Sequence, residues 1–198
     1  MKIFFIKSST VTIKKYNIKD IPGSSGRLDV ISRCILSALT NGNVLEKNIQ
    51  IWIFLDRYGT FVLDSNSFND ENFPKNELQL ADSFVTVIKK SINEEKYPET
   101  TLDSIEYSNL SIFDAIKNFV EKKYKIYVLN ENGMDFRMVF EELGSKDNLL
   151  FIIGDQSGDL LHNNKLKKLN LTNLSFGTRS YLASSTIRLI KMHLDLIV

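Results

Sequence analysis

Apolar runs of strand length alternate along the chain with segments in which apolar residues recur every three or four positions. The runs are "KIFFI" at 2–6, "IQIWIFL" at 49–55, "TFVLD" at 60–64, "KIYVLN" at 125–130 and "NLLFIIG" at 148–154. Several of them lack polar alternation, which is typical of strands that are covered on both faces. The pattern therefore predicts buried strands.

Helical spacing appears between and after these runs. The segments are 27–39, 77–92, 111–123 and 179–197. Strands that alternate with helices of this length predict an α/β fold with a largely parallel sheet. The polar stretch "DSNSFNDENFPKN" at 64–76 predicts a loop. The sequence before the last segment predicts a short strand and then a loop around Gly177.

The first helical segment follows "IPGSSG", an unusual concentration of turn residues in a chain with nine glycines and three prolines. Apolar residues at helical spacing give this helix a core face: Leu28, Ile31, Ile35 and Leu39. We expect Ser25 or Gly26 at the N-cap, and Asp29 in the first turn suits the helix dipole.

The same stretch has two possible interpretations. Pro22, Gly23 and Gly26 impose a tight approach whose backbone amides can face an anion at the helix start. The simpler interpretation is a loop, a cap and an Asp29–Arg33 pair at i, i+4. The spacing matches neither a Walker A loop nor a Rossmann fingerprint, so the ordinary nucleotide-binding motifs are excluded.

Composition narrows the class of protein. With 43% apolar residues in 198, the chain can bury a full core, and its longest apolar stretches are far shorter than the roughly 20 residues of a membrane span. A single cysteine, Cys34, excludes an internal disulfide and a multi-cysteine metal site. We therefore expect a soluble protein of a reducing compartment, the cytoplasm.

Charge gives little sign of a partner. The chain has 25 basic and 24 acidic residues, so no global positive field points to a nucleic acid. Any RNA site has to be local.

A second candidate site is "NLLFIIGDQSG" at 148–158, a buried strand that ends in Gly-Asp-x-x-Gly. In open α/β sheets, ligands bind beyond the carboxyl ends of the strands, and glycines there let the backbone approach a ligand closely. By itself the motif is weak.

Taken in order, four segments resemble the archaeal tRNA pseudouridine(54) N1-methyltransferase family of the SPOUT class. The family patterns are Leu-Pro-Gly-Ser-x-Gly-Arg-Leu-Asp, a strand that ends Tyr-Leu-x-x-Asn-Gly, Phe-Ile-Ile-Gly-Asp-His-x-Gly, and Leu-Gly-Pro-Leu-x-Leu-x-Ala-x-His-Cys. Here they read "IPGSSGRLD", "KIYVLNENG", "FIIGDQSG" and "SFGTRSYLASSTI". The resemblance covers nearly the whole chain.

The chain departs from the family at several positions. The histidine after Gly-Asp is Gln156, the late proline is Thr178, and the His-Cys pair is Ser185 and Thr186. "RYGTFVLDSN" replaces the proline-rich segment that follows Tyr-Gly in the family. Since cofactor loops of this class bind largely through backbone atoms, these changes bear more on reaction specificity than on the cofactor.

The resemblance implies a single SPOUT methyltransferase domain over 1–198, with S-adenosyl-L-methionine bound in a C-terminal trefoil knot over about 125–198. Carried over position by position, it gives these cofactor residues: Leu129, Gly154, Phe176, Gly177, Thr178, Arg179, Ser180, Tyr181 and Thr186. Each could instead be structural. Leu129 and Phe176 could be core, the glycines could serve turns, and Thr186 could bond its own i−4 carbonyl.

The resemblance also implies the reaction, in which N1 of pseudouridine 54 in tRNA loses its proton and takes the methyl group without a metal. We expect Arg27 to grip a phosphate or orient the base, with Arg33 in support at the RNA site. Asp29 would orient Arg27 or accept the proton; a carboxylate held by an arginine is a weak base.

The family further implies a homodimer paired through the knot region. The last helix carries Leu182, Ile187, Ile190, Leu194 and Ile197, which could pack at that interface or inside the subunit. We expect the interface.

Three other functions stay open. The first is a related enzyme that methylates a pseudouridine in ribosomal RNA. The second is a non-catalytic RNA-binding or assembly protein that keeps the knot. The third is an unrelated flavodoxin-like phosphate binder.

Overall fold

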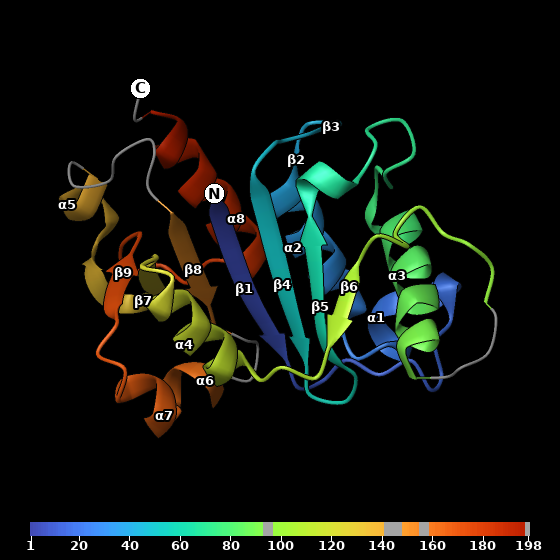
Figure 1. Ribbon diagram of the computed structural model, residues 1–198, viewed down its shortest axis with the longest axis horizontal. Coiled ribbons are helices and arrows are strands. Elements are labelled where there is room, and N and C mark those ends of the chain that lie inside the picture. The colour runs from blue at the N-terminus through green and yellow to red at the C-terminus, as the bar shows by residue number, and fades with distance from the viewer. Residues whose placement is uncertain (93–96, 141–147, 155–158, 197–198) are drawn as a thin grey trace.

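The computed structural model describes residues 1–92, 97–140, 148–154 and 159–196 (Figure 1). A seven-stranded sheet runs through it in the order β6-β5-β4-β1-β8-β7-β9. Its strands are β1 (Lys2–Ser8), β4 (Ile49–Leu55), β5 (Gly59–Asp64), β6 (Glu106–Ser108), β7 (Lys125–Asp135), β8 (Leu149–Ile153) and β9 (Thr172–Ser175). A small hairpin, β2 (Thr40–Asn41) with β3 (Val44–Leu45), stands apart.

The sheet is mostly parallel. β1 pairs in parallel with both β4 and β8, and β7 pairs in parallel with both β8 and β9. β5 is antiparallel to β4 and to β6. The carboxyl ends of β1, β4 and β8 therefore meet along one edge of the sheet, the lower edge in Figure 1.

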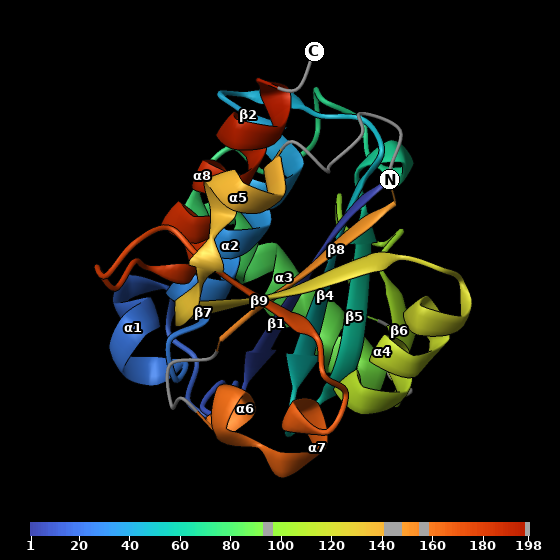
Figure 2. The ribbon, with the colours of Figure 1, turned by 90° about the vertical axis from the view of Figure 1, so that its left-hand side faces the viewer.

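Helices cover both faces of the sheet. The longer ones are α2 (Leu28–Leu39), α3 (Glu77–Ile92), α4 (Ile112–Glu121) and α8 (Ala183–Asp195). The short ones are η1 (Ile18–Asp20), α1 (Ile21–Ser24), η2 (Ser65–Ser67), α5 (Phe136–Phe140), α6 (Asp159–His162) and α7 (Asn164–Lys167). Figure 2 looks onto the β9 edge, with α2 and α8 on one side of the sheet and α4 on the other.

Alternate residues of β1 serve the two faces. Phe4 and Ile6 join the core under α2, α3 and α8, whereas Ile3 and Phe5 join the core under α4, α6 and α7. All four side chains are at most 3% exposed. Burial on both faces explains why this strand shows no polar alternation in the sequence.

The predicted elements are largely confirmed. The five predicted strands correspond to β1, β4, β5, β7 and β8, and three of the helices begin and end within two residues of their predicted bounds. The last helix begins at Ala183 instead of residue 179. Segment 64–76 contains η2 and is otherwise irregular.

The expected position of the first N-cap is wrong. α2 begins at Leu28, so Arg27 is its N-cap residue, with a φ of 72° in the left-handed region. Ser25 is nevertheless fully buried, and its hydroxyl oxygen accepts from the Leu28 N–H at 3.0 Å. Ser25 thus caps the helix through its side chain from two residues further upstream.

The apolar side of α8 packs inside the subunit, which corrects the expected interface role of three residues. Ile187, Ile190 and Leu194 lie in the core with α2 and are at most 7% exposed. Leu182 is 64% exposed, and Ile197 lies outside the described residues. Among the described residues, no helix combines the length and apolar character that crossing a bilayer demands.

Candidate cofactor and RNA site

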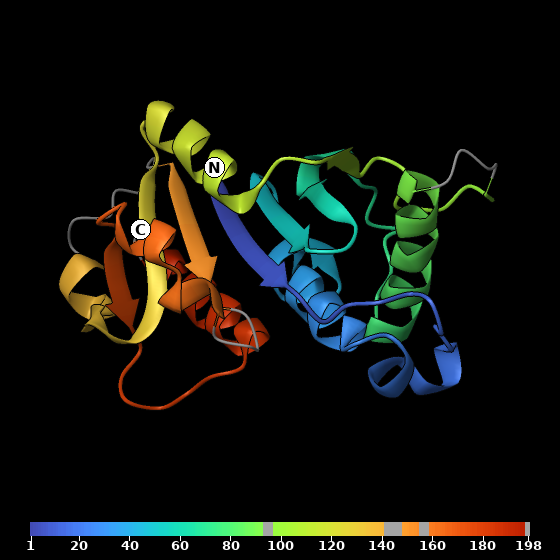
Figure 3. The same ribbon diagram turned by 90° about the horizontal axis from the view of Figure 1, so that it is seen from below.

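A cavity of about 630 Å³ opens beside the carboxyl ends of β8 and β9 and the middle of β7. Segments far apart in the sequence form its wall: residues 129–132 of β7, the residue after β8, helices α6 and α7, and the connection from β9 to α8. Figure 3 shows that connection, which returns from the edge strand β9 to the start of α8. The sheet topology therefore brings three of the four motif segments together.

Eight of the nine residues expected at the cofactor line this cavity: Leu129, Gly154, Phe176, Gly177, Arg179, Ser180, Tyr181 and Thr186. Thr178 is exposed and is not part of the lining. Gln156, the residue in the place of the family histidine, lies outside the described residues.

Several of these residues have a structural role as well. Leu129 belongs to the core, and Phe176 stacks on Phe136 with ring centroids 4.8 Å apart. The Thr186 hydroxyl donates to the Leu182 carbonyl at 3.3 Å, the i−4 bond considered from the sequence. Of Ser185 and Thr186, the two residues in place of His-Cys, Thr186 alone lines the cavity.

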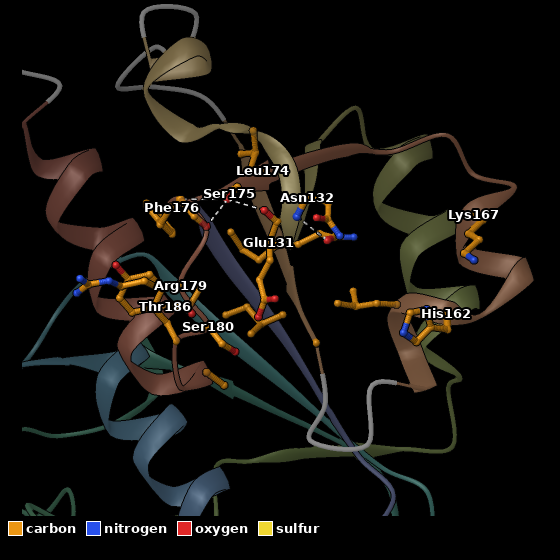
Figure 4. Close-up of a pocket in the computed structure, with 18 residues that line it drawn as sticks. Glu131, Asn132, His162, Lys167, Leu174, Ser175, Phe176, Arg179, Ser180 and Thr186 are labelled. Atoms are coloured by element: carbon orange, nitrogen blue, oxygen red, sulfur yellow. Dashed lines mark hydrogen bonds between the residues drawn. The ribbon is translucent and has the colours of Figure 1, made fainter.

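The sequence pattern gave no sign of the polar wall of the cavity. β7 is interrupted: its pairing with β9 jumps from Leu129↔Leu174 to Met134↔Leu174, so residues 130–133 bulge out of the ladder. Asn130, Glu131 and Asn132 of this bulge line the cavity (Figure 4). Opposite them are His162 and Lys167 from α6 and α7.

Buried Ser175 fixes the bulge to the loop after β9. Its hydroxyl oxygen lies 3.1 Å from the Glu131 carbonyl and 2.9 Å from the Gly177 carbonyl, and it accepts from the Gly177 N–H at 3.0 Å (Figure 4). One hydroxyl therefore links two parts of the wall. The linked residues belong to the segments "ENG" and "LSFG", which are over 40 residues apart in the sequence. Nothing local in either segment predicts the contact between them.

Two glycines leave room in the wall. A Cβ at Gly154 would lie 2.9 Å from a methyl carbon of Leu161, closer than real Cβ contacts allow. Gly177 has a φ of 102°, a conformation that L residues with side chains rarely adopt. Both positions present main-chain atoms toward the cavity.

Arg27, Asp29 and Arg33 form a charged cluster at the start of α2. The Arg27 guanidinium grips the Asp29 carboxylate at 3.0 and 3.2 Å, and Arg33 Nη2 lies 2.5 Å from Asp29 Oδ2. The pair predicted between Asp29 and Arg33 is thus confirmed. Arg33 also lies 3.4 Å from Glu77.

Asp29 is ionised in this cluster. Asp29 as a residue is 7% exposed, and burial by itself raises the pKa of its carboxyl. The hydrogen bonds and charges of Arg27 and Arg33 outweigh that effect and hold the pKa of Asp29 below its ordinary value. A carboxylate held in this way orients arginines well and accepts protons poorly.

The cluster lies next to the large cavity. Arg27 lines a small hollow together with Lys7, Gly154 and Ala183, and the last two also line the large cavity. Arg27 therefore lies near the glycine that follows β8. The Arg27 side chain is half-exposed, and its backbone has a left-handed conformation within the turn.

Two of the amides around the start of α2 are already bonded within the chain, which favours the simpler interpretation of this stretch. The Gly23 N–H donates to Asp20 at 3.1 Å and the Leu28 N–H donates to Ser25. Gly26 instead has a structural reason: its φ is 59°, and a Cβ there would collide with the Thr10 carbonyl. In the described part of the chain, no group of three His, Cys, Asp or Glu side chains could hold a metal ion.

A family model described as "Putative SAM-dependent RNA methyltransferase" matches residues 1–197. The chain belongs to this family. It is thus an RNA methyltransferase whose methyl donor is S-adenosylmethionine.

Curated relatives match most of the length of this chain. Two named tRNA (pseudouridine(54)-N(1))-methyltransferase, from Pyrococcus abyssi and Thermococcus onnurineus, are 29% and 27% identical over 98% of the chain and 98% and 97% of their own. One of the same name from Methanococcus maripaludis is 32% identical over 80% of the chain and 79% of its own.

A solved structure shares the fold. Archaeoglobus fulgidus Nep1 bound to S-adenosylhomocysteine superposes with a TM-score of 0.61 over 99% of this chain and 98% of its own, at 16% identity. The mostly parallel sheet with helices on both faces is therefore common to both proteins.

Proposed function

We propose that this methyltransferase transfers a methyl group to N1 of pseudouridine 54 in the T loop of tRNA. The observation that carries the proposal is the extent of the likeness, 98% of the chain, to relatives of that name. The placement of the arginine cluster beside a ligand-sized cavity supports it.

The large cavity fits S-adenosylmethionine. Its volume of about 630 Å³ lies within the range of about 300–1,000 Å³ of small-molecule sites. Leu129 and Phe176 offer apolar contact, Gly154 and Gly177 expose main chain, and Glu131 offers a carboxylate to the cationic donor. We assign cofactor binding to the eight lining residues named above. Thr178 belongs to the same loop but does not line the cavity.

The cofactor, when bound, supplies an electrophilic sulfonium methyl group to the nucleophilic N1. The task of the protein is then to position the base and to stabilise the charge that develops as N1 loses its proton. We assign that task to Arg27, which lines the same hollow as Gly154 and is half-exposed to solvent.

Asp29 acts as a positioning residue in this scheme. Its bidentate contact fixes the Arg27 guanidinium, and its depressed pKa makes it a poor acceptor for the N1 proton. The proton leaves toward solvent. Arg33 shares the same carboxylate and supports the RNA contact.

We further propose that residues of about 125–198 form a trefoil knot within a single SPOUT domain over 1–198. The support is the path of the chain, which leaves the sheet at its β9 edge and returns as α8 against α2, near the middle of the sheet (Figure 3).

A homodimer in the cytoplasm completes the proposal. Large apolar side chains stay exposed on α5 and on the outer side of α8: Met138 at 70%, Met192 at 53% and Leu196 at 68%. The two helices are neighbours, since the rings of Phe136 and His193 lie 5.3 Å apart. A second copy of the chain would cover this surface, and sedimentation of Met192→Glu as a monomer would support it.

The decisive experiment uses labelled S-adenosylmethionine and tRNA transcripts that carry uridine or pseudouridine at position 54, followed by nucleoside mass spectrometry. We expect N1-methylpseudouridine on the second transcript alone. Product on both transcripts overturns the specificity, and transfer to ribosomal RNA alone favours the related enzyme. Cofactor binding without transfer to any RNA favours the non-catalytic protein.

A further inference from the structure

A second groove lies at the carboxyl end of β4, with a volume of about 470 Å³. The β4–β5 turn, the residues after β6 and the start of α4 form it, along the lower edge of the sheet in Figure 1. Lys7 lines this β4–β5 groove and also lines the small hollow that contains Arg27. The groove and the hollow therefore lie on either side of Lys7, at the same edge of the sheet.

The groove carries one uncompensated positive charge. Its charged lining residues are Lys7, Asp56 and Arg57. Lys7 Nζ lies 2.8 Å from Asp56 Oδ2, so these two charges neutralise each other. Arg57 is exposed, and within the described chain it makes no ion pair. A guanidinium in this state is suited to a phosphate.

An aromatic ring stands at the same groove. Tyr107 is 41% exposed, and its ring packs beside Phe61 at 5.3 Å between centroids. Its hydroxyl donates to Asn109 at 2.9 Å, which fixes the ring further. A half-exposed ring that is held from one side offers its other side for stacking.

Gly59 makes room for this ring. Its φ is 89°, and a Cβ there would lie 2.8 Å from Tyr107 Cε2 and 2.8 Å from the Ser108 carbonyl oxygen. The Tyr58-Gly59 dipeptide, which the chain shares with the family pattern although the next segment differs, thus shapes the groove. The buried Tyr58 anchors the turn by accepting from the Ile13 N–H at 2.9 Å.

We propose that the β4–β5 groove holds an unpaired nucleotide of the RNA next to the target nucleotide, with its base on Tyr107 and its phosphate on Arg57. The inference rests on the proposed function, and it adds a second contact outside the cofactor cavity. Single-stranded loops are recognised by such a combination of a basic contact and an aromatic platform. Because Lys7 lines both the groove and the hollow that contains Arg27, a nucleotide that neighbours the target in the RNA is the occupant we propose.

The first test measures the affinity of a fluorescent T-arm hairpin with pseudouridine by anisotropy. Tyr107→Leu should weaken binding roughly tenfold, whereas Tyr107→Phe, which keeps the ring, should stay close to the wild type. Arg57→Ala should weaken binding and lower the salt slope by about one. Lys117→Ala removes another exposed positive charge, outside the groove, and should change neither quantity. Thermal melting checks that each variant folds.

The second test places 5-iodouridine at positions that flank residue 54 and maps the photo-crosslink by mass spectrometry. We expect a crosslink to Tyr107. Equal affinities of Tyr107→Leu and the wild type, equal losses for Arg57→Ala and Lys117→Ala, or crosslinks only outside the groove would each overturn the inference. If the wild type methylates the hairpin and the groove variants bind it normally, the groove alone is refuted; a wild type that neither binds nor methylates it refutes both proposals.

Discussion

Asp29 is one carboxylate shared by two arginines, and its replacement separates positioning from cofactor binding. Asp29→Asn keeps the shape but loses the charge that holds Arg27 and Arg33. We expect methyl transfer to fall about tenfold or more, because an unheld guanidinium positions the base poorly. Titration calorimetry should give an unchanged affinity for S-adenosylhomocysteine. Glu121→Gln, on the exposed side of α4, is the control.

Acid stability gives an independent test of the same cluster. The pKa of Asp29 is lowered by folding, so its contribution to stability is present above its unfolded value of about 3.9 and is lost as the pH falls through the folded pKa. The difference in unfolding free energy between wild type and Asp29→Asn should be constant near neutrality and shrink below about pH 4. A difference that persists unchanged in acid would contradict this account.

Cys34 should be inert in the folded protein. It is fully buried in α2, and burial raises the pKa of its thiol to about 12, with a small opposing effect of Arg33. A thiol that stays protonated and covered does not attack a disulfide reagent. We expect no reaction with Ellman's reagent in native buffer and full reaction in concentrated guanidinium chloride. Rapid labelling of the native protein would contradict the packing of α2.

The contacts of single residues were the part of the structure that the sequence predicted least well. The pattern predicted the Asp29–Arg33 pair because both residues lie on one helix. It could not show that Arg27 has a left-handed backbone or that Ser175 links Glu131 to Gly177, because these depend on contacts between distant segments. The expected cofactor residues came from resemblance and gather at one cavity because the sheet aligns three strand ends.

Helices α2 and α8 are joined by a buried ammonium group. Lys191 is 6% exposed; it donates to the carbonyls of Ser37, Ala38 and Thr40 and pairs with Glu46 at 2.6 Å. Lys191→Met should lower the free energy of unfolding by about 3–5 kcal/mol. The substitution leaves the partly buried Glu46 carboxylate without its ion-pair partner and the last carbonyls of α2 without their donor. Lys117→Met, at an exposed pair, should cost less than about 0.5 kcal/mol in the same denaturant titration.

The turn that carries Arg27 depends on Gly26, and Gly42 provides a matched comparison. Their φ angles are 59° and 60°, but a Cβ at Gly26 would collide with Thr10, whereas a Cβ at Gly42 would have no atom within 4 Å. Gly42→Ala should therefore cost about 1 kcal/mol, the conformational penalty alone. Gly26→Ala should cost clearly more and should also reduce methyl transfer. Equal melting points for the two variants would refute the collision.

Helices and strands were predictable where the apolar residues followed a single pattern, either a continuous run or a helical spacing. Strands such as β1 and β8 are continuous apolar runs, and α3 was predicted with its observed bounds. β6 has three residues and no apolar pattern, so its pairing with β5 decides its conformation. The role of α8 could not be read from its periodicity, because an apolar stripe looks the same whether the helix packs inside the subunit or against a partner.

At the scale of the whole molecule, the sheet holds the arginine cluster and the large cavity that we propose for the cofactor at the same edge. A ligand that binds only the folded protein raises its stability by mass action, about 2.7 kcal/mol at a concentration one hundred times Kd. S-adenosylhomocysteine should therefore raise the melting temperature of the wild type. Gly154→Val, which crowds the wall against Leu161, should abolish that rise. Adenosine monophosphate, which lacks the amino-acid moiety, is the control.

The interruption of β7 also bears on how this enzyme can diversify. Leu174 faces both Leu129 and Met134, so the ladder resumes on the same partner after the bulge. Residues can be gained or lost between those two positions without moving any strand relative to its neighbour. Lineages can thus remodel the polar rim of the cavity while the scaffold stays constant, and length variation among homologues should concentrate there.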